Sequence, residues 1–262
     1  MNDDTRPEYS KLAEVYDALM EDVDYAYWAD FIDALMQQHH PDPRHVLEVA
    51  CGTGSLAISL DELDCYEITA TDKSPDMIRQ ARRKGREAGS EVDFRVMDFL
   101  DIDLDQRYDV VFSVFDSVNY LHSTRQVDAM LQETRRVLRP GGLLIFDFTT
   151  PRNSIQAIRY LNNEEGYAEG GYRYFRKSRY DPEEKIHYND FRIEKLADDR
   201  ETVLREFREL HRQRIYTLTE MREVVAATDY RLAAAYKGFE MEEADNRSLR
   251  ITMVLRCPID RS

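Results

Sequence analysis

The stretch from His45 to Leu60 reads HVLEVACGTGSLAISL, and it decides the fold. It opens with a short apolar run, residues 46–49, of the length expected for a buried strand. Residues 51–54 then predict a tight glycine turn, and residues 55–60 show apolar side chains at helical spacing. A strand, a glycine turn and the start of a helix form the front half of a nucleotide-binding unit, because glycines let a ligand approach the backbone and the helix offers unpaired N–H groups.

This motif alone fits more than one ligand. Residues 52–57 match the dinucleotide pattern G-x-G-x-x-A, which would indicate a nicotinamide or flavin cofactor. A glycine turn that binds nothing is the simplest alternative. Motifs elsewhere in the chain are needed to distinguish these interpretations.

Length and composition restrict the class of protein. The 262 residues, 42% of them hydrophobic, suffice for one sizeable core with an insertion. Mean hydropathy is −0.63, and no apolar run is long enough for a membrane span. Residues 1–9 are polar and acidic, so we expect no secretory signal. Cys51, Cys65 and Cys257 show no metal-binding spacing, and we expect a cytoplasmic protein without disulfides or metal.

The charge balance disfavours nucleic acid as a partner. The net charge is −15, and most arginines alternate with acids along the chain, as on solvated faces. Acids are abundant and lysines few, which fits either adaptation to salt or a GC-rich genome.

Strands and helices alternate through the central region. Residues 46–49, 66–71, 92–97, 108–115 and 143–148 are strand-like, and helical segments lie between several of them. Ser74 and Pro75 mark one helix start, and residues 123–126 form a capping-box start for another. This alternation predicts a parallel sheet with right-handed crossovers.

The flanking regions differ from this core. Residues 10–20 and 24–38 predict two helices. Residues 172–179, 185–195 and 201–215 are aromatic-rich strands that suggest an antiparallel meander, followed by a helix at 219–227 and two strands at 232–236 and 248–257. We therefore expect a helical cap (1–43), a Rossmann-like core (44–150), a β insertion acting as a substrate lid or dimerisation element (151–216), and a C-terminal helix and two strands that complete the core sheet (217–262).

Several motifs together resemble one family. Residues 48–54 (EVACGTG), Asp72, the pair Asp98-Phe99 and residues 138–142 (LRPGG) are similar to the motifs of class I S-adenosylmethionine (SAM)-dependent methyltransferases. Residues 16–20, 116–121 and 213–216 resemble more narrowly the small bacterial YqeM-like methyltransferases, and the resemblance covers residues 8–257. Ala50 departs from the family pattern, which has glycine there; we expect crowding without loss of binding.

The resemblance implies an α/β fold with a seven-stranded sheet in the order 3-2-1-4-5-7-6, the last strand antiparallel. It also implies transfer of a methyl group from SAM to a nitrogen or oxygen of a small molecule, with S-adenosylhomocysteine as product. Alternatives are a SAM-binding regulatory or scaffold protein, a protein methyltransferase, and an NAD(P)-dependent oxidoreductase. We expect no nucleic-acid or membrane partner, and a homodimer through the insertion is an option.

The resemblance also assigns residues to the cofactor. Asp72 is expected to accept both ribose hydroxyls, Asp98 the adenine amine, and Glu48 to reach the methionine amino group. The cofactor-binding set is Tyr16, Glu48, Ala50, Cys51, Gly52, Gly54, Asp72, Lys73, Met77, Asp98, Phe99 and Phe115.

The acceptor side is less defined by the sequence. An amine or hydroxyl acceptor can need a base, for which the candidates are His122, His211 and Asp116, with His187 a weaker one. Asn119, Tyr120, Arg214 and Tyr216 are expected to shape the substrate pocket. Arg214 could hold an anionic substrate or simply pair with one of the many acids.

Overall fold

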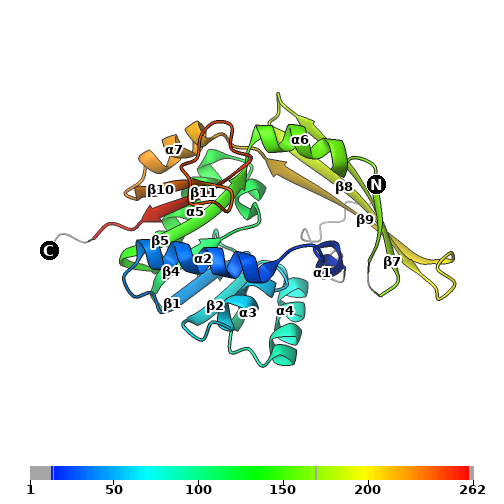
Figure 1. The fold of residues 1–262 in the computed structure, drawn as a ribbon, viewed down its shortest axis with the longest axis horizontal. Helices are drawn as coiled ribbons and strands as arrows, with labels where there is room; N and C mark the ends of the chain where they lie inside the picture. The colour runs from blue at the N-terminus through cyan, green and yellow to red at the C-terminus, as the bar shows by residue number, and fades with distance from the viewer. Residues whose placement is uncertain (1–12, 14, 169, 260–262) are drawn as a thin grey trace.

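The computed structural model describes residues 13, 15–168 and 170–259, which form a central α/β body and a projecting antiparallel sheet (Figure 1). The central sheet has seven strands in the order β10-β11-β5-β4-β1-β2-β3. Its strands are β1 (His45–Val49), β2 (Glu67–Asp72), β3 (Asp93–Val96), β4 (Tyr108–Ser113), β5 (Leu138–Thr149), β10 (Arg231–Lys237) and β11 (Arg250–Arg256). β11 runs antiparallel to both of its neighbours, so the predicted sheet order and the reversed last strand are confirmed.

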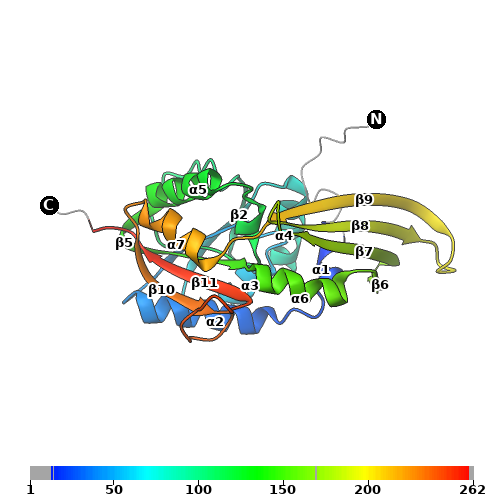
Figure 2. The same ribbon diagram turned by 90° about the horizontal axis from the view of Figure 1, so that it is seen from above.

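Two helical layers cover this sheet, one on each face (Figure 2). One cluster of buried side chains joins the sheet to α2 (Tyr25–His39), α3 (Ser55–Asp61) and α4 (Pro75–Ala88). The opposite cluster joins it to α5 (Thr124–Val137) and α7 (Leu218–Ala226). β4 is buried along its whole length, as expected for a strand that is covered on both faces.

The insertion forms a second sheet that extends away from the central body (Figure 2). Its strands β6 (Glu164–Ala168), β7 (Tyr172–Asp181), β8 (Ile186–Leu196) and β9 (Val203–Arg214) pair as an antiparallel meander in chain order. The last three strands match those predicted from the sequence, whereas β6 and the helix α6 (Pro151–Leu161) were not predicted. The start signals of α6 were present, because Thr150 caps it through the Asn153 N–H and Pro151 occupies its first turn.

The amino-terminal helix is shorter than predicted. Helix α1 covers Tyr16–Leu19, and most of residues 10–15 of the expected helix lies outside the described part of the chain. The second predicted helix is confirmed as α2, with Asp24 as its cap. After β4 the chain forms a short 3-10 helix, η2 (Ser117–Tyr120), which was not predicted from the sequence.

Gly54 is required by both backbone and packing. Its φ of +77° lies in the left-handed region, and a Cβ at this position would stand 2.5 Å from the Phe94 ring and 2.9 Å from the Ala81 Cβ. Gly89, at the end of α4, has a similar φ of +70°, but a Cβ placed there would meet no atom within 4 Å. The two glycines therefore separate the conformational cost from the packing cost.

We predict that Gly54→Ala lowers the free energy of unfolding by about 3 kcal/mol or more, because about 1 kcal/mol of left-handed strain adds to overpacking against Phe94. Gly89→Ala is the matched control and is expected to lose only about 1 kcal/mol. Urea unfolding followed by circular dichroism measures both. Equal losses in the two variants would contradict the close packing of α3, α4 and β3 around Gly54.

Candidate cofactor and active site

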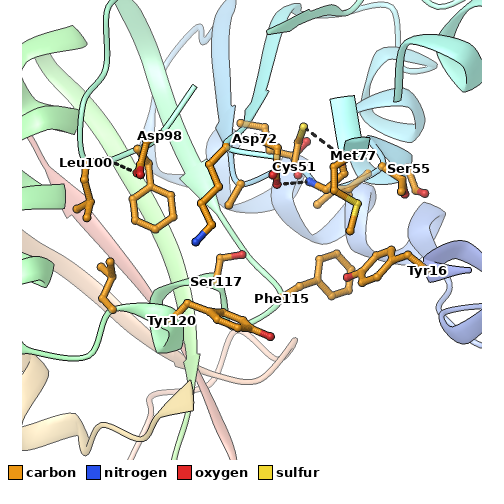
Figure 3. A pocket seen from close by; sticks show the side chains of 18 of the residues that line it. Tyr16, Cys51, Ser55, Asp72, Met77, Asp98, Leu100, Phe115, Ser117 and Tyr120 are labelled. Carbon is orange, nitrogen blue, oxygen red and sulfur yellow. Dashed lines mark hydrogen bonds between the residues drawn. The ribbon is translucent and has the colours of Figure 1, made fainter. Parts of the chain in front are cut away.

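A cavity opens at the carboxyl ends of the central parallel strands, where ligands bind in open α/β sheets (Figure 3). Eleven of the twelve residues predicted for the cofactor line it, together with Tyr120 from the predicted substrate set. They are Tyr16, Glu48, Ala50, Cys51, Gly52, Asp72, Lys73, Met77, Asp98, Phe99 and Phe115. Gly54 does not line it, because its space is closed by Phe94 and Ala81.

The glycine turn is built from left-handed residues. Ala50, Gly52 and Gly54 have φ values of 59°, 56° and 77°. Ala50 therefore adopts a conformation that favours glycine, which gives a physical reason for the glycine in the family pattern. The backbone N–H of Cys51 donates to the Thr71 carbonyl at 2.8 Å, which fixes the turn to the end of β2.

Asp72 connects this turn to the next helix. Its Oδ2 accepts the Gly52 N–H at 3.0 Å and its Oδ1 accepts the Ser74 N–H at 2.8 Å. Burial raises the pKa of Asp72, and these two backbone donors oppose that rise. Each oxygen retains lone-pair capacity, so the carboxylate can accept further hydrogen bonds from a diol in the cavity.

Glu48 brings a buried carboxyl to the same cavity. Its side chain is 2% exposed, and its Oε2 has no hydrogen-bond partner among the described residues. Burial first, and the Asp72 charge second, raise the pKa of Glu48 to about 8. The Ala57 backbone opposes this rise through a hydrogen bond, but the unpartnered Oε2 stays costly to bury, so this position suits a cationic group of a ligand.

A third acidic residue at the cavity, Asp98, follows the end of β3. Asp98 lines the wall beside Phe99 and accepts the Leu100 N–H at 2.9 Å (Figure 3). Only one of its carboxylate oxygens is used in this bond, so the other can face a donor such as an exocyclic amine.

An aromatic wall closes the side toward α2. Phe115 has a φ of 59°, and its ring lies 4.2 Å from that of Trp28 and 5.6 Å from that of Tyr25, measured between centroids. Burial raises the pKa of Tyr25 to about 12, which keeps its phenol neutral. Tyr25 lines the cavity but was not predicted to do so; its position directly after the cap Asp24 was the available signal.

A lysine ties α1 to the glycine turn. Lys84 Nζ lies 2.9 Å from Asp17 Oδ1, 3.2 Å from Thr53 Oγ1 and 2.5 Å from Ser55 Oγ. Thr53 also donates to Asp17 at 2.5 Å. Ser55 and Thr53 line the cavity and were not predicted, although both belong to the quoted motif. This cluster holds Tyr16 beside the turn.

Several predicted acceptor-side residues are used elsewhere. Asn119 is fully buried, and its amide bonds the backbone of Thr149 and the Arg214 carbonyl. Tyr216 is also buried and donates to the Leu121 carbonyl. Neither lines the cavity, and their bonds connect the η2 region to β5 and to the chain that leaves β9, so their expected substrate contacts stay predictions.

The charged candidates show the same pattern. Asp116 Oδ1 pairs with Arg250 at 2.5 Å and Oδ2 accepts from Gln213 at 2.7 Å, which leaves it poorly suited to act as a base. Arg214 lies 3.3 Å from Glu220 and over the Tyr216 ring. Neither Asp116 nor Arg214 lines the cavity.

The three histidine candidates differ in their surroundings. His122 is exposed and its Nε2 bonds the Arg212 carbonyl at 2.9 Å. His187 is buried in the insertion against Ser178 at 2.9 Å. His211 is buried and contacts Tyr120, a cavity residue, at 3.1 Å.

Metal ligation and membrane insertion find no support in the described part of the chain. Residues 13, 15–168 and 170–259 contain no group of three or more His, Cys, Asp or Glu side chains arranged to hold a metal ion. Over the same residues, no helix combines the length and apolar character that a membrane span requires.

Comparison with known proteins identifies relatives of the central region. Residues 46–142 match a family model described as a methyltransferase domain. The chain is 34% identical over 140 residues to YqeM of Bacillus subtilis (strain 168), which carries the name of a methyltransferase, and the match covers 53% of this chain and 54% of that protein. It is 30% identical over 137 residues to the dTDP-3-amino-3,4,6-trideoxy-alpha-D-glucopyranose N,N-dimethyltransferase of Streptomyces venezuelae, covering 52% and 56%. The chain thus spans about half the length of these curated relatives.

A solved structure extends the similarity to nearly the whole chain. An S-adenosylmethionine-dependent methyltransferase from Clostridium acetobutylicum ATCC 824 superposes with a TM-score of 0.79 at 22% identity, covering 95% of this chain and 99% of that one. At this identity the likeness establishes the fold.

We predict that Glu48→Gln stabilises the ligand-free protein increasingly as pH rises from 5 to 8. The folded-state pKa of about 8 lies above the usual glutamate value of 4.5, so the wild-type protein loses stability over this interval as the unfolded chain ionises first. The glutamine variant lacks this loss, and its advantage should grow by about 1 kcal/mol per pH unit.

Urea unfolding at pH 5, 6.5 and 8 measures this advantage. Glu62→Gln, at the exposed carboxyl end of α3, is the control and should show a constant difference from wild type. A constant difference for Glu48→Gln as well would mean that Glu48 is already ionised in the folded protein.

Proposed function

We propose that the chain transfers a methyl group from SAM to a nitrogen or oxygen of a small molecule, because residues 46–142 match a model described as a methyltransferase domain and the fold resembles that of a SAM-dependent methyltransferase. The single observation that carries the proposal is the placement of the acids around the glycine turn. The buried Glu48 carboxyl, whose Oε2 has no hydrogen-bond partner among the described residues, lies just before the turn, and Asp72 lies at the end of the next strand.

This distribution of charge suits SAM and disfavours a dinucleotide. SAM presents cationic ammonium and sulfonium groups at its methionine end, which a buried carboxyl would stabilise. A pyrophosphate on the same turn would place negative charges beside Glu48 and Asp72, both of which already have raised pKa values. The oxidoreductase alternative is therefore not favoured by the electrostatics.

The proposed roles follow the order of the strands. Glu48 faces the methionine ammonium, Asp72 accepts the ribose hydroxyls, and Asp98 accepts from the adenine amine beside Phe99. The turn at residues 50–52 contacts the methionine backbone, while Tyr16 and Phe115, which lie side by side in the cavity wall (Figure 3), cover the cofactor.

Methyl transfer needs alignment more than activation, because the sulfonium already makes the methyl group a strong electrophile. The acceptor atom must approach in line with the sulfur–methyl bond, in a site from which water is largely excluded. Phe115 and Tyr25 supply an apolar wall for such a site, and Trp28 supports it by packing against Phe115.

A small-molecule acceptor is supported by one relative and by the charge. The S. venezuelae relative is named for a dTDP-linked amino sugar, and amine methylation of a small molecule is compatible with this cavity. A net charge of −15 disfavours RNA. A cytoplasmic location and a homodimer through the insertion stay predictions from the sequence.

Isothermal titration calorimetry with SAM, S-adenosylhomocysteine and NADH tests the cofactor. We expect SAM and S-adenosylhomocysteine to bind and NADH not to bind. Incubation with methyl-labelled SAM and the small-molecule fraction of a source-cell extract then tests transfer. Binding of SAM without label transfer would favour a SAM-responsive scaffold, and binding of NADH alone would overturn the proposal.

We predict that Asp72→Ala weakens SAM binding about 100-fold, since two charge-assisted hydrogen bonds to the ribose are lost. Asp76→Ala is the control, because Asp76 lies in the first turn of α4 and pairs with Arg79 at 2.6 Å outside the cavity. Titration calorimetry gives both affinities, and urea unfolding checks that each variant is folded. An unchanged affinity in folded Asp72→Ala would mean that the ribose lies elsewhere.

A further inference from the structure

Three side chains connect the cavity to the insertion in a line. Tyr120 lines the cavity on the side opposite Asp72 and Cys51 (Figure 3). Its hydroxyl lies 3.1 Å from His211 Nδ1, and His211 Nε2 lies 3.3 Å from Glu209 Oε2. The order from the cavity inward is therefore phenol, imidazole, carboxylate.

This line is held in place by a set of bonds between the η2 region and β9. His122 Nε2 bonds the Arg212 carbonyl at 2.9 Å, and Asn119 Nδ2 donates to the Arg214 carbonyl at 2.7 Å. These contacts come from the residues on either side of Tyr120 and Leu121, so they fix the register in which Tyr120 and His211 meet.

Burial makes the line more than a surface contact. The His211 side chain is 3% exposed and that of Glu209 is 10% exposed. Phe191 from β8 packs edge-on against the imidazole at 5.6 Å, and the residue paired with His211 on β8 is the uncharged Asn189. The guanidinium of Arg176, on β7, lies over the Phe191 ring, 5.0 Å from its centroid.

The carboxylate determines which way the proton can move. Nε2 lies within ion-pair distance of Glu209 but makes no hydrogen bond with it, so the carboxylate favours the tautomer with its hydrogen on Nε2 through its charge alone. Nδ1 is then an acceptor, and the Tyr120 hydroxyl donates to it. The same order of hydroxyl, imidazole and carboxylate operates in catalytic triads, where the carboxylate stabilises the imidazolium that forms.

We propose that Tyr120, His211 and Glu209 form a proton relay that removes the proton from the methyl acceptor, an inference that rests on the proposed function. Tyr120 is the group that faces the acceptor, and His211 and Glu209 are positioning residues behind it. The acceptor must therefore carry an exchangeable N–H or O–H.

The step balances without another reactant. The acceptor lone pair forms the bond to the methyl carbon, and the sulfur–methyl bond breaks with its electron pair moving to sulfur. The acceptor proton passes to the Tyr120 oxygen as the Tyr120 proton passes to His211 Nδ1. The imidazolium, paired with Glu209, later releases a proton to solvent.

The first test is the tautomer of His211 in the protein with S-adenosylhomocysteine bound. Long-range proton–nitrogen NMR at pH 8 on protein with labelled histidine should show a hydrogen on Nε2 and a bare Nδ1. The His211 signals are assigned among the 6 histidines by their shift in Tyr120→Phe. A hydrogen on Nδ1 would overturn the relay, because Tyr120 would then be the acceptor of that bond.

The second test uses label transfer from methyl-labelled SAM to the small-molecule extract. Tyr120→Phe should lower the rate about 100-fold while the affinity for S-adenosylhomocysteine changes less than about threefold. Glu209→Gln keeps the imidazole and should lower the rate about tenfold. It should also change the pH–rate profile, because the imidazolium that forms is no longer paired with a carboxylate.

Tyr188→Phe is the control, since Tyr188 lies on β8 and its hydroxyl bonds Glu184 away from the cavity. If wild type binds neither SAM nor S-adenosylhomocysteine, the proposed function fails. If wild type binds and transfers label but Tyr120→Phe transfers it equally fast, the relay alone fails. A rate loss in Glu209→Gln without a shift in the pH profile would assign Glu209 a purely structural role and would also overturn the relay.

Discussion

The cavity depends on one buried carboxylate that holds two backbone segments together. Asp72 accepts the N–H of Gly52 from the glycine turn and the N–H of Ser74 at the start of α4. Burying a carboxylate is costly, and these two donors offset the cost in the absence of ligand. They also fix the distance between the ends of β1 and β2. The site is thus preorganised around a negative charge that still has acceptor capacity for a ligand.

The opposite wall depends on a second buried cluster, which acts through the backbone. Phe115 and Asp116 are both left-handed, with φ values of 59° and 52°. Arg250 of β11 pairs with Asp116 and with the fully buried Asp147 of β5, and the Asp116 N–H donates to Asp147 at 2.7 Å. A guanidinium between two carboxylates can satisfy both, and its loss would leave the buried Asp147 carboxylate without its cationic partner. This cluster holds the strained corner that directs Phe115 into the cavity and begins η2.

The sequence was most informative where site residues follow the ends of parallel strands. Glu48, Asp72 and Asp98 belong to or follow β1, β2 and β3, and such ends meet at one edge of the sheet, so their shared cavity was predictable from spacing. The bonds of Asn119 and Tyr216 were not predicted, because their partners, Arg214 and Leu121, are 95 residues away in the chain. No local pattern encodes such contacts. The helix α6 was missed because the aromatic strands around it dominated the interpretation of the insertion, although Thr150 and Pro151 marked its start.

The two halves of the site have different structural origins, and this has a consequence for acceptor choice. Apart from Tyr16 and Tyr25, the cofactor half arises from strand ends and turns within residues 46–142, whereas Tyr120 meets His211 and Glu209 because β9 is bonded to η2. Displacement reactions are sensitive to misplacement on the scale of about 1 Å, so a change at the η2–β9 junction would affect the acceptor more than SAM. Sequence changes in β7–β9 can therefore alter the acceptor while Asp72, Glu48 and the glycine turn remain as they are. If the proposed function holds, we expect the insertion, and not the glycine motif, to determine which molecule is methylated.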